Sequence, residues 1–262
     1  MIGYPSDITR QQFELIRPDL EAVRQRTRPR QVDLYEIFNA VLYILRTGSQ
    51  WRQLPHDFPK WQTAYGYFRR WSEPIDEVGH SQLDLILKKL SIKGRLRMGR
   101  SAPTSFIILD AQSVKNTEAA ENKGYDGGKK VSGIKRHLAV DINGWPQAIH
   151  ITTANVSERD GAAALLALNS EQFRLVKRVM ADGGYTGENF AGLVQNMIGA
   201  EMIIAKQSDL KHGRITPQRW VVERSFSWLD KCRRLWRNCE RYLQTSRIMV
   251  ALAFIRLLLK RY

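Results

Sequence analysis

Three acidic residues, Asp110, Asp182 and Glu223, stand in sequence contexts that would hold their carboxylates in place. Asp110 follows the apolar run at 106–109, and Asp182 follows the run at 179–181 and precedes two glycines. Each aspartate is therefore predicted to be the last residue of a buried strand. Glu223 falls at the border of the buried face of a segment with helical periodicity. Acids from two strand ends and one helix can converge on one point, where they would hold divalent cations for phosphoryl transfer.

Each of these acids taken singly is explained as well by structure, because aspartate before glycine is common in turns. The combination of placements is what favours a metal site. Three neighbouring carboxylates repel one another and bind protons more readily unless a cation is present. The predicted cofactor is therefore Mg²⁺, with Mn²⁺ as a substitute, and two ions about 4 Å apart would flank a phosphodiester. Such a site needs neither a covalent protein nucleophile nor a nucleotide cofactor.

Other polar residues compete for the same role. Asp160 lies three residues after a serine, which is a capping-box spacing, and is interpreted as structural. Asp141 precedes the Asn143-Gly144 turn, and Asp126 lies in a Gly-rich loop, so both are interpreted as turn residues. His137 is flanked by basic residues and could touch a polyanion, but a lone histidine in a strand is usually structural.

Charge is distributed unevenly along the chain. The 262 residues carry a net charge of +15, yet residues 101–200 hold 10 basic and 10 acidic side chains. Residues 1–100 hold 17 basic against 11 acidic side chains, and residues 201–262 hold 14 against 5. A neutral middle between two basic ends favours a catalytic core with flanking surfaces for a polyanion. This pattern favours a nucleic-acid partner over the alternatives that the chain is a ribosomal protein or binds a membrane surface.

Two cysteines, Cys232 and Cys239, are predicted on a single helix. Seven residues of helix separate their Cα atoms by about 10 Å, which is too far for a disulfide. Their spacing matches no zinc motif either. No secretory signal and no apolar stretch long enough to cross a bilayer is recognised, so a cytoplasmic protein is expected.

The first hundred residues are predicted to be helical. Asp33 has the position of an N-cap and Gly48 that of a C-terminal glycine, with an apolar stripe between them. A second helix at 61–71 is rich in aromatic and basic residues, among them Arg69 and Arg70. The pair favours a helix-turn-helix that binds DNA. The aromatic residues are equally explained as the core of a plain helical bundle.

Beyond a boundary at 95–103 the pattern becomes mixed α/β. The predicted elements are strands at 105–110, 134–142 and 146–154, a helix at 158–169, a strand at 176–182, a helix at 187–199, a strand at 201–206, and helices at 217–236 and 245–261. Asn143-Gly144 predicts a hairpin between the second and third strands. The stretch 113–133 is predicted to be a long mobile loop. A meander followed by alternating helix and strand is the order of the RNase H-like fold.

These residues together resemble the DDE transposases of bacterial insertion sequences, specifically the "insertion sequence five" family. The resemblance runs nearly end to end. Its most specific pieces are Leu45-Arg46-Thr47-Gly48-Ser49-Gln50-Trp51-Arg52-Gln53-Leu54-Pro55, Ile108-Leu109-Asp110-Ala111-Gln112-Ser113-Val114-Lys115, the Gly-rich segment before Lys135-Arg136-His137, Ala154-Asn155-Val156-Ser157-Glu158-Arg159-Asp160, Ala181-Asp182-Gly183-Gly184-Tyr185 and Arg219-Trp220-Val221-Val222-Glu223-Arg224.

The resemblance implies a helical DNA-binding domain at 1–100 and an RNase H-like catalytic domain at 101–262 that includes the C-terminal helices. It implies that Asp110, Asp182 and Glu223 bind two Mg²⁺ ions per active site. The implied enzyme recognises terminal inverted repeats, nicks DNA with water and joins the freed 3′-hydroxyl to target DNA. Double-stranded DNA is the implied partner, with a homodimer in the DNA complex and a location in the bacterial nucleoid.

A signature of related families around the third acid is only partly present. Arg219 keeps the place of its arginine, the tyrosine position holds Thr216, and the lysine position holds Asp230 with Lys231 one residue on. The residues predicted to contact DNA are Arg69, Arg70, Lys129, Lys130, Lys135, Arg136, Arg219, Arg224, Lys231, Arg233 and Arg234. Two other functions stay open: a structure-selective nuclease of the same fold, and a domesticated DNA-binding protein or repressor without catalysis.

Overall fold

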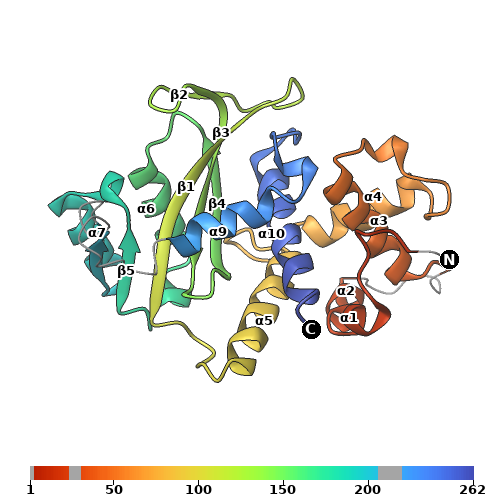
Figure 1. The fold of residues 1–262 in the computed structure, drawn as a ribbon, viewed down its shortest axis with the longest axis horizontal. Coiled ribbons are helices and arrows are strands. Elements are labelled where there is room, and N and C mark those ends of the chain that lie inside the picture. Colours follow the sequence, from red (N-terminus) through yellow and green to blue (C-terminus); the bar gives the residue numbers. More distant parts are fainter. Residues whose placement is uncertain (1–2, 24–30, 206–219) are drawn as a thin grey trace. The chain divides into compact units, whose positions relative to one another are not determined.

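A computed structural model describes residues 3–23, 31–205 and 220–262 (Figure 1). The chain forms two compact units that do not follow a single cut in the sequence. One unit comprises 1–90, 229–236 and 248–262, and the other comprises 91–228 and 237–247. The division by function at residue 100 is not tested by these contacts and stays a prediction.

The first unit is built from short helices whose ends follow from their sequences. Its N-terminal part holds α1 (Arg10–Glu14), α2 (Arg17–Ala22), α3 (Leu34–Thr47), the 3-10 turn η1 (Trp51–Gln53) and α4 (Trp61–Ser72). Asp33 caps α3 by accepting from the backbone N–H of Tyr35 at 2.9 Å. Gly48 ends α3 in the left-handed region at φ 73°, as predicted, because glycine adopts that conformation without steric cost.

The aromatic residues of α4 divide between core and surface. Phe68 and Trp71 are buried, and the Trp71 indole donates to the carbonyl of Leu20 at 3.2 Å. Tyr65 stays 37% exposed. The buried members therefore confirm the bundle-core interpretation for part of the stripe.

The second unit is a six-stranded mixed sheet with helices. Strands β1 (Phe106–Lys115), β2 (Gly124–Asp126), β3 (Val131–Val140) and β4 (Pro146–Thr153) pair antiparallel around β3. Strands β5 (Arg178–Ala181) and β6 (Glu201–Ile204) continue the sheet from β1 in parallel. The path β2-β3-β1-β5-β6, with β4 also on β3, is the meander followed by parallel strands expected for an RNase H-like fold. The predicted α/β class with N-terminal helices is confirmed.

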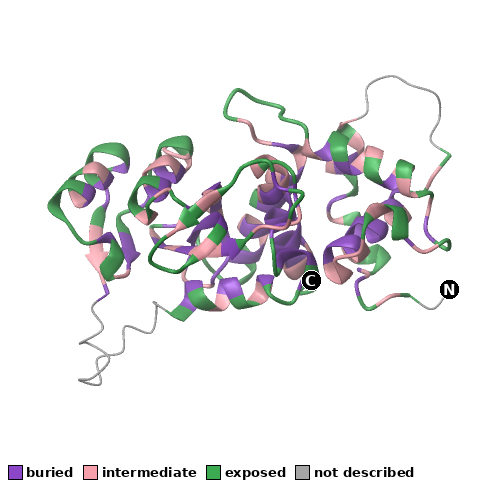
Figure 2. Ribbon diagram, turned by 90° about the horizontal axis from the view of Figure 1, so that it is seen from above, coloured by how far each residue is buried: buried purple, intermediate pink, exposed green. Residues whose placement is uncertain are grey.

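Alternation along β1 places its apolar residues on both faces of the sheet. Ile107 and Leu109 belong to a buried cluster that also holds Leu165 of α6 (Glu158–Leu168) and Val194 of α7 (Glu188–Ile198). Ile108 and Asp110 follow the other phase of the strand. Figure 2 shows buried residues along the strands and on the inner sides of the helices, with exposed residues on the outer sides. The remaining helical elements are α5 (Gln82–Arg97), η2 (Glu171–Phe173), η3 (Gly183–Tyr185), α9 (Trp220–Leu229), η4 (Arg233–Leu235) and α10 (Leu243–Leu259).

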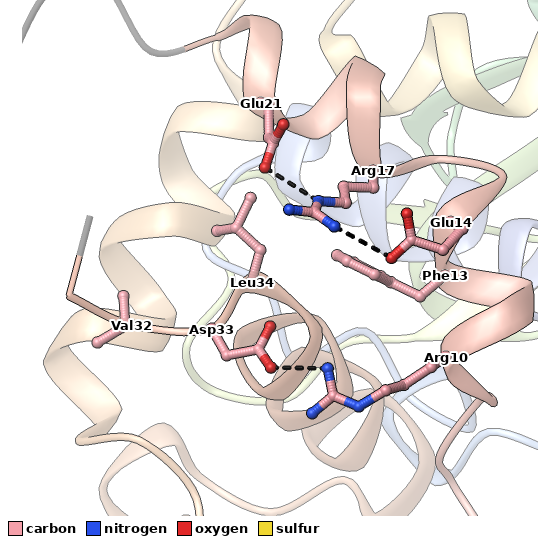
Figure 3. Close-up of a pocket in the computed structure, with 8 residues that line it drawn as sticks. All are labelled: Arg10, Phe13, Glu14, Arg17, Glu21, Val32, Asp33 and Leu34. Atoms are coloured by element: carbon pink, nitrogen blue, oxygen red, sulfur yellow. Dashed lines mark hydrogen bonds and ion pairs between the residues drawn. The ribbon is translucent and has the colours of Figure 1, made fainter. Parts of the chain in front are cut away.

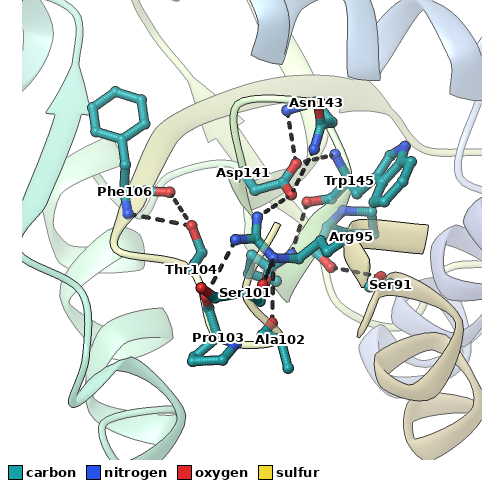
Figure 4. Close-up of polar contacts among 12 residues, drawn as sticks. Ser91, Arg95, Ser101, Ala102, Pro103, Thr104, Phe106, Asp141, Asn143 and Trp145 are labelled. Atoms are coloured by element: carbon teal, nitrogen blue, oxygen red, sulfur yellow. Dashed lines mark hydrogen bonds and ion pairs between the residues drawn. The ribbon is translucent and has the colours of Figure 1, made fainter. Parts of the chain in front are cut away.

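The hairpin between β3 and β4 turns at the predicted place and is fixed by a buried ion pair (Figure 4). Gly144 has φ 80°, and its N–H donates to the carbonyl of Asp141 at 2.8 Å. The Asp141 carboxylate accepts from Arg95 at 2.6 Å and from the backbone N–H of Trp145 at 3.0 Å. The side chains of Arg95 and Asp141 are 6% and 0% exposed. Asp141 is thus a turn residue, as predicted, and also the partner of a buried arginine.

Three element boundaries differ from prediction. β1 runs five residues past Asp110, so Asp110 is not the last residue of its strand. The stretch 113–133, predicted as a loop, contains the end of β1, all of β2 and the start of β3. The helix predicted at 217–236 ends at Leu229, so Cys232 and Cys239 do not share a helix; both are nevertheless free thiols, as expected.

Candidate active site

Asp110 and Asp182 are placed next to each other by strand pairing. β1 and β5 run in parallel with Ile108 beside Met180, and the same register continued by two residues puts Asp110 level with Asp182. Both carboxylates are anchored locally. Asp110 accepts from the N–H of Ala111 at 2.7 Å, and Asp182 caps η3 by accepting from the N–H of Gly184 at 2.9 Å. Asp182 was predicted as the last residue of its strand, but β5 ends at Ala181 and Asp182 follows it as the N-cap of η3.

The electrostatics of Asp110 favour a cation nearby. Burial raises the pKa of Asp110 to about 7, and the negative charges of Asp182 and Glu158 contribute to the rise. The backbone N–H of Ala111 and the ammonium group of Lys129 oppose it. A buried carboxylate next to like charges is stabilised in its ionised form by a divalent cation, and carboxylate oxygens are the ligands that Mg²⁺ prefers. The residues at this position therefore fit the predicted cofactor.

Glu158 is a neighbour of this pair that the sequence analysis did not identify. It is the first residue of α6, after the N-cap Ser157, whose side chain accepts from the N–H of Asp160 at 3.1 Å. The Asp160 carboxylate also accepts from the Ser157 hydroxyl at 2.7 Å, which supports its predicted structural role at this helix start. Acidic residues are favoured in the first turn of any helix, so the sequence around Glu158 carried no signal that would separate a site residue from an ordinary helix start.

Tyr185 places a hydroxyl against the same acids. The residue is 1% exposed, and its hydroxyl has no hydrogen-bond partner in the structure. Burial raises the pKa of Tyr185 well above its ordinary value, and the charges of Asp110, Glu158 and Asp182 add to the effect. Tyr185 therefore lies within electrostatic range of all three carboxylates.

Glu223 lies on α9, in the same compact unit as the two aspartates. The helix packs on the β3–β4 turn, where Arg224 donates to the carbonyl of Asn143 at 2.9 Å and Ser225 donates to that of Gly144 at 2.9 Å. Val222 and Phe226 are buried whereas Glu223 is exposed, which agrees with a place at the edge of the buried stripe. Within 3–23, 31–205 and 220–262, no three His, Cys, Asp or Glu side chains are close enough to hold one ion. The structure brings Asp110 and Asp182 together but not all three acids, and the role of Glu223 stays a prediction.

Several predicted DNA contacts are engaged inside the protein. Lys135 and Arg136 are 5% and 2% exposed, and Lys135 donates to the carbonyl of Val156 at 2.8 Å. Arg234 is 8% exposed and donates to the carbonyl of Ser49 at 3.0 Å. These three side chains are not surface groups in this structure.

The remaining predicted DNA contacts are exposed, apart from Arg224, which is partly buried, and Arg219, which is not described. Arg224 lies between the rings of Trp220 and Trp228, at 4.4 and 4.9 Å from their centroids, which holds its guanidinium in place. Arg219 lies outside the described residues. The exposed members are Arg69, Arg70, Lys129, Lys130, Lys231 and Arg233.

A separate pocket lies in the helical unit (Figure 3). Its volume is about 380 Å³, and its lining includes Arg10, Arg17 and Asp33. Arg10 pairs with Asp33 at 2.8 Å, and Arg17 pairs with Glu14 at 3.3 Å. Because the lining charges pair with one another, the pocket gives no indication of a ligand.

Comparisons with known proteins give similarities in both the N-terminal and the C-terminal part of the chain. Residues 101–258 match the family described as "Transposase DDE domain", and residues 8–74 match "Putative transposase of IS4/5 family". A relative from Burkholderia cepacia, "Putative transposase for insertion sequence element IS402", is 33% identical over 116 residues. That match covers 42% of this chain and 54% of the relative, so the chain spans about half of its length. Of the helices in the described parts, none has the length and apolar character that crossing a bilayer requires.

Proposed function

The chain belongs to the DDE transposase family, and from this membership we propose that it cuts and joins DNA at the ends of an insertion sequence. In the proposed reaction, water attacks a phosphodiester at a terminal inverted repeat and releases a 3′-hydroxyl. This hydroxyl then attacks a phosphorus atom in target DNA and displaces the 3′ oxygen of the target strand. The observation that carries the proposal is the pair Asp110–Asp182, two anchored carboxylates that the parallel register of β1 and β5 brings level within the matching domain.

The proposed ligands of the metal ions are Asp110, Asp182 and Glu223. When bound, Mg²⁺ or Mn²⁺ lowers the pKa of an attacking oxygen and stabilises the charge on the leaving oxygen. The chain's own contribution is to hold these ligands still. The N–H groups of Ala111 and Gly184 orient the two aspartates, so little reorganisation is needed when the charge of the substrate arrives.

Binding of DNA is proposed to use exposed basic residues of both proposed domains. Arg69 and Arg70, exposed on α4, belong to the proposed DNA-binding part at 1–100, and Lys130 and Lys231 are exposed in the proposed catalytic part at 101–262. A transposase must hold two element ends together, so we expect a homodimer on DNA. In a bacterial cell such a protein would be associated with the nucleoid.

Strand transfer separates this proposal from a nuclease of the same fold. The test incubates the protein with Mg²⁺, a target plasmid and a duplex that carries an inverted-repeat end. The label is on the strand whose 3′ end is transferred. We expect the label to become covalently joined to the plasmid. Cleavage of the duplex with no joined product would favour the structure-selective nuclease instead. Binding without cleavage would favour the domesticated repressor.

A further inference from the structure

We propose that Glu158 is a fourth carboxylate of the candidate active site and that Lys129 neutralises it until a divalent cation binds. The inference rests on the proposed function, because it concerns the same cluster of acids. It adds two residues to that cluster and couples them: binding of the ion and release of Lys129 are one exchange. Lys129 was predicted as a DNA contact, and the exchange would make its ammonium group available to a phosphate.

The side chain of Lys129 contacts both Glu158 and the backbone next to Asp110. Its Nζ lies 2.7 Å from Oε1 of Glu158 and donates to the carbonyl of Ala111, the residue after Asp110, at 3.3 Å. The side chains of Lys129 and Glu158 are 47% and 22% exposed. An ammonium group is therefore already seated beside the acids, in a half-exposed position from which it can leave.

The carboxylates of Glu158 and Asp182 both lie close to Gly184. A Cβ atom added to Gly184 would lie 3.1 Å from Oδ1 of Asp182 and 3.1 Å from Oε2 of Glu158. Both carboxylates therefore lie over the same glycine, which has no side chain to separate them. The charges of both also act on Asp110. Glu158 thus lies beside Asp110 and Asp182 and is not only a helix start, although among the described residues the three carboxylates are not close enough to hold one ion before it binds.

An independent observation indicates a ligand at this cluster. The hydroxyl of Tyr185 is buried, lacks a hydrogen-bond partner among the described residues and interacts electrostatically with Asp110, Asp182 and Glu158. Buried hydroxyl groups in proteins are nearly always hydrogen-bonded. A ligand or its hydration water seated among these acids would give the Tyr185 hydroxyl a partner.

The positive charges of Lys129 and of a divalent ion favour exchange of one for the other over simultaneous binding. An ammonium group and a divalent ion repel each other and compete for the same carboxylate oxygens. The backbone at Lys129 is held separately, because its N–H donates to Oδ1 of Asp126 at 3.0 Å. The side chain can therefore leave Glu158 while the β2–β3 turn keeps its shape.

The test measures Mn²⁺ binding by the DNA-free full-length protein, from the electron paramagnetic resonance signal of free Mn²⁺. Four proteins are compared at one ionic strength: wild type, Lys129→Gln, Lys130→Gln and Asp110→Ala. Lys130→Gln is the matched control, because it removes the same charge from the neighbouring residue. We expect Lys129→Gln to bind Mn²⁺ about tenfold more tightly than wild type, and Lys130→Gln to differ by less than about twofold. Thermal melting checks that all four proteins are folded.

The outcomes separate this inference from the function on which it rests. Tighter binding by Lys129→Gln alone supports the exchange. Equal affinities for Lys129→Gln and Lys130→Gln overturn the exchange, while loss of binding in Asp110→Ala still supports the proposed metal site. If wild type, Lys129→Gln and Lys130→Gln bind Mn²⁺ no more tightly than Asp110→Ala, both the exchange and the proposed metal site are overturned.

Discussion

Replacement of Asp110 by alanine is expected to lower the rate of DNA cleavage by at least about a thousandfold, the scale of losing a preorganised electrostatic group. Asp110 is partly buried, and burial together with neighbouring acids raises its pKa to about 7. Asp110 is the one acidic residue of β1, so no other carboxylate of that strand can replace it as a ligand. Binding of element-end DNA is expected to change by less than about threefold, because that affinity comes mainly from phosphate contacts.

The measurement is single-turnover cleavage of an end-labelled duplex, with affinity determined in parallel by gel shift in Ca²⁺. Asp110→Asn is a second variant that keeps the size of the side chain and its acceptor for the N–H of Ala111. Glu188→Gln, at the exposed start of α7, is the control and should cleave at the wild-type rate. Wild-type cleavage by both Asp110 variants would remove this residue from the active site.

Replacement of Asp141 by alanine is expected to lower the free energy of unfolding by about 3–5 kcal/mol, the usual cost of breaking a buried ion pair from one side. Arg95 would keep its charge at 6% side-chain exposure, with only the carbonyl oxygens of Ser101, Ala102 and Pro103 as partners. The N–H groups of Asn143 and Trp145, which donate to Asp141 at 2.8 and 3.0 Å, would lose their acceptor as well. The β3–β4 turn, on which α9 packs, would then be the first region to loosen.

Urea denaturation followed by tryptophan fluorescence measures this effect. The matched control is Glu171→Ala, which breaks an exposed pair with Arg174 whose side chains are 87% and 75% exposed. Exposed pairs contribute little, so this change should leave the midpoint almost unchanged. Equal midpoints for Asp141→Ala and Glu171→Ala would show that the buried pair does not hold the turn.

Local signals explain what could be predicted from the sequence. Asp33 and Gly48 mark the ends of α3 because capping depends on a few neighbouring backbone groups. Asn143-Gly144 marks the hairpin because one left-handed residue is enough to turn the chain. Asp182 was placed to within one residue of the end of β5 for the same reason, since the apolar run and the glycines that bracket it lie within a few residues.

Nonlocal pairing explains what could not be predicted. β1 continues past Asp110 because Ala111 to Lys115 pair with β3, although their composition resembles a loop. Lys135 lies on β3, and its buried charge is met by Asp126 at 3.2 Å, a partner that only the β2–β3 pairing supplies. The early end of α9 is an exception, because it follows from a local turn in which the N–H of Cys232 donates to the carbonyl of Leu229 at 2.8 Å.

The candidate site shows the same division. Asp110 and Asp182 were identified from the strands that carry them, and the parallel register of β1 and β5 brings them level. Glu158 was missed because its approach to Asp182 over Gly184 depends on the packing of α6. For Glu223, a helical wheel predicts the border of the buried stripe but not the distance of the carboxylate from the sheet.

We propose that Asp110, Asp182 and Glu223 bind common metal ions. Crystals of the protein grown with Mn²⁺ would decide this, through the anomalous difference map collected at the manganese edge. We expect one or two peaks, with oxygen atoms of all three side chains about 2.0–2.3 Å from the ions. Manganese bound to Asp110 and Asp182 but to no oxygen of Glu223, or no manganese at the aspartates, would contradict the claim.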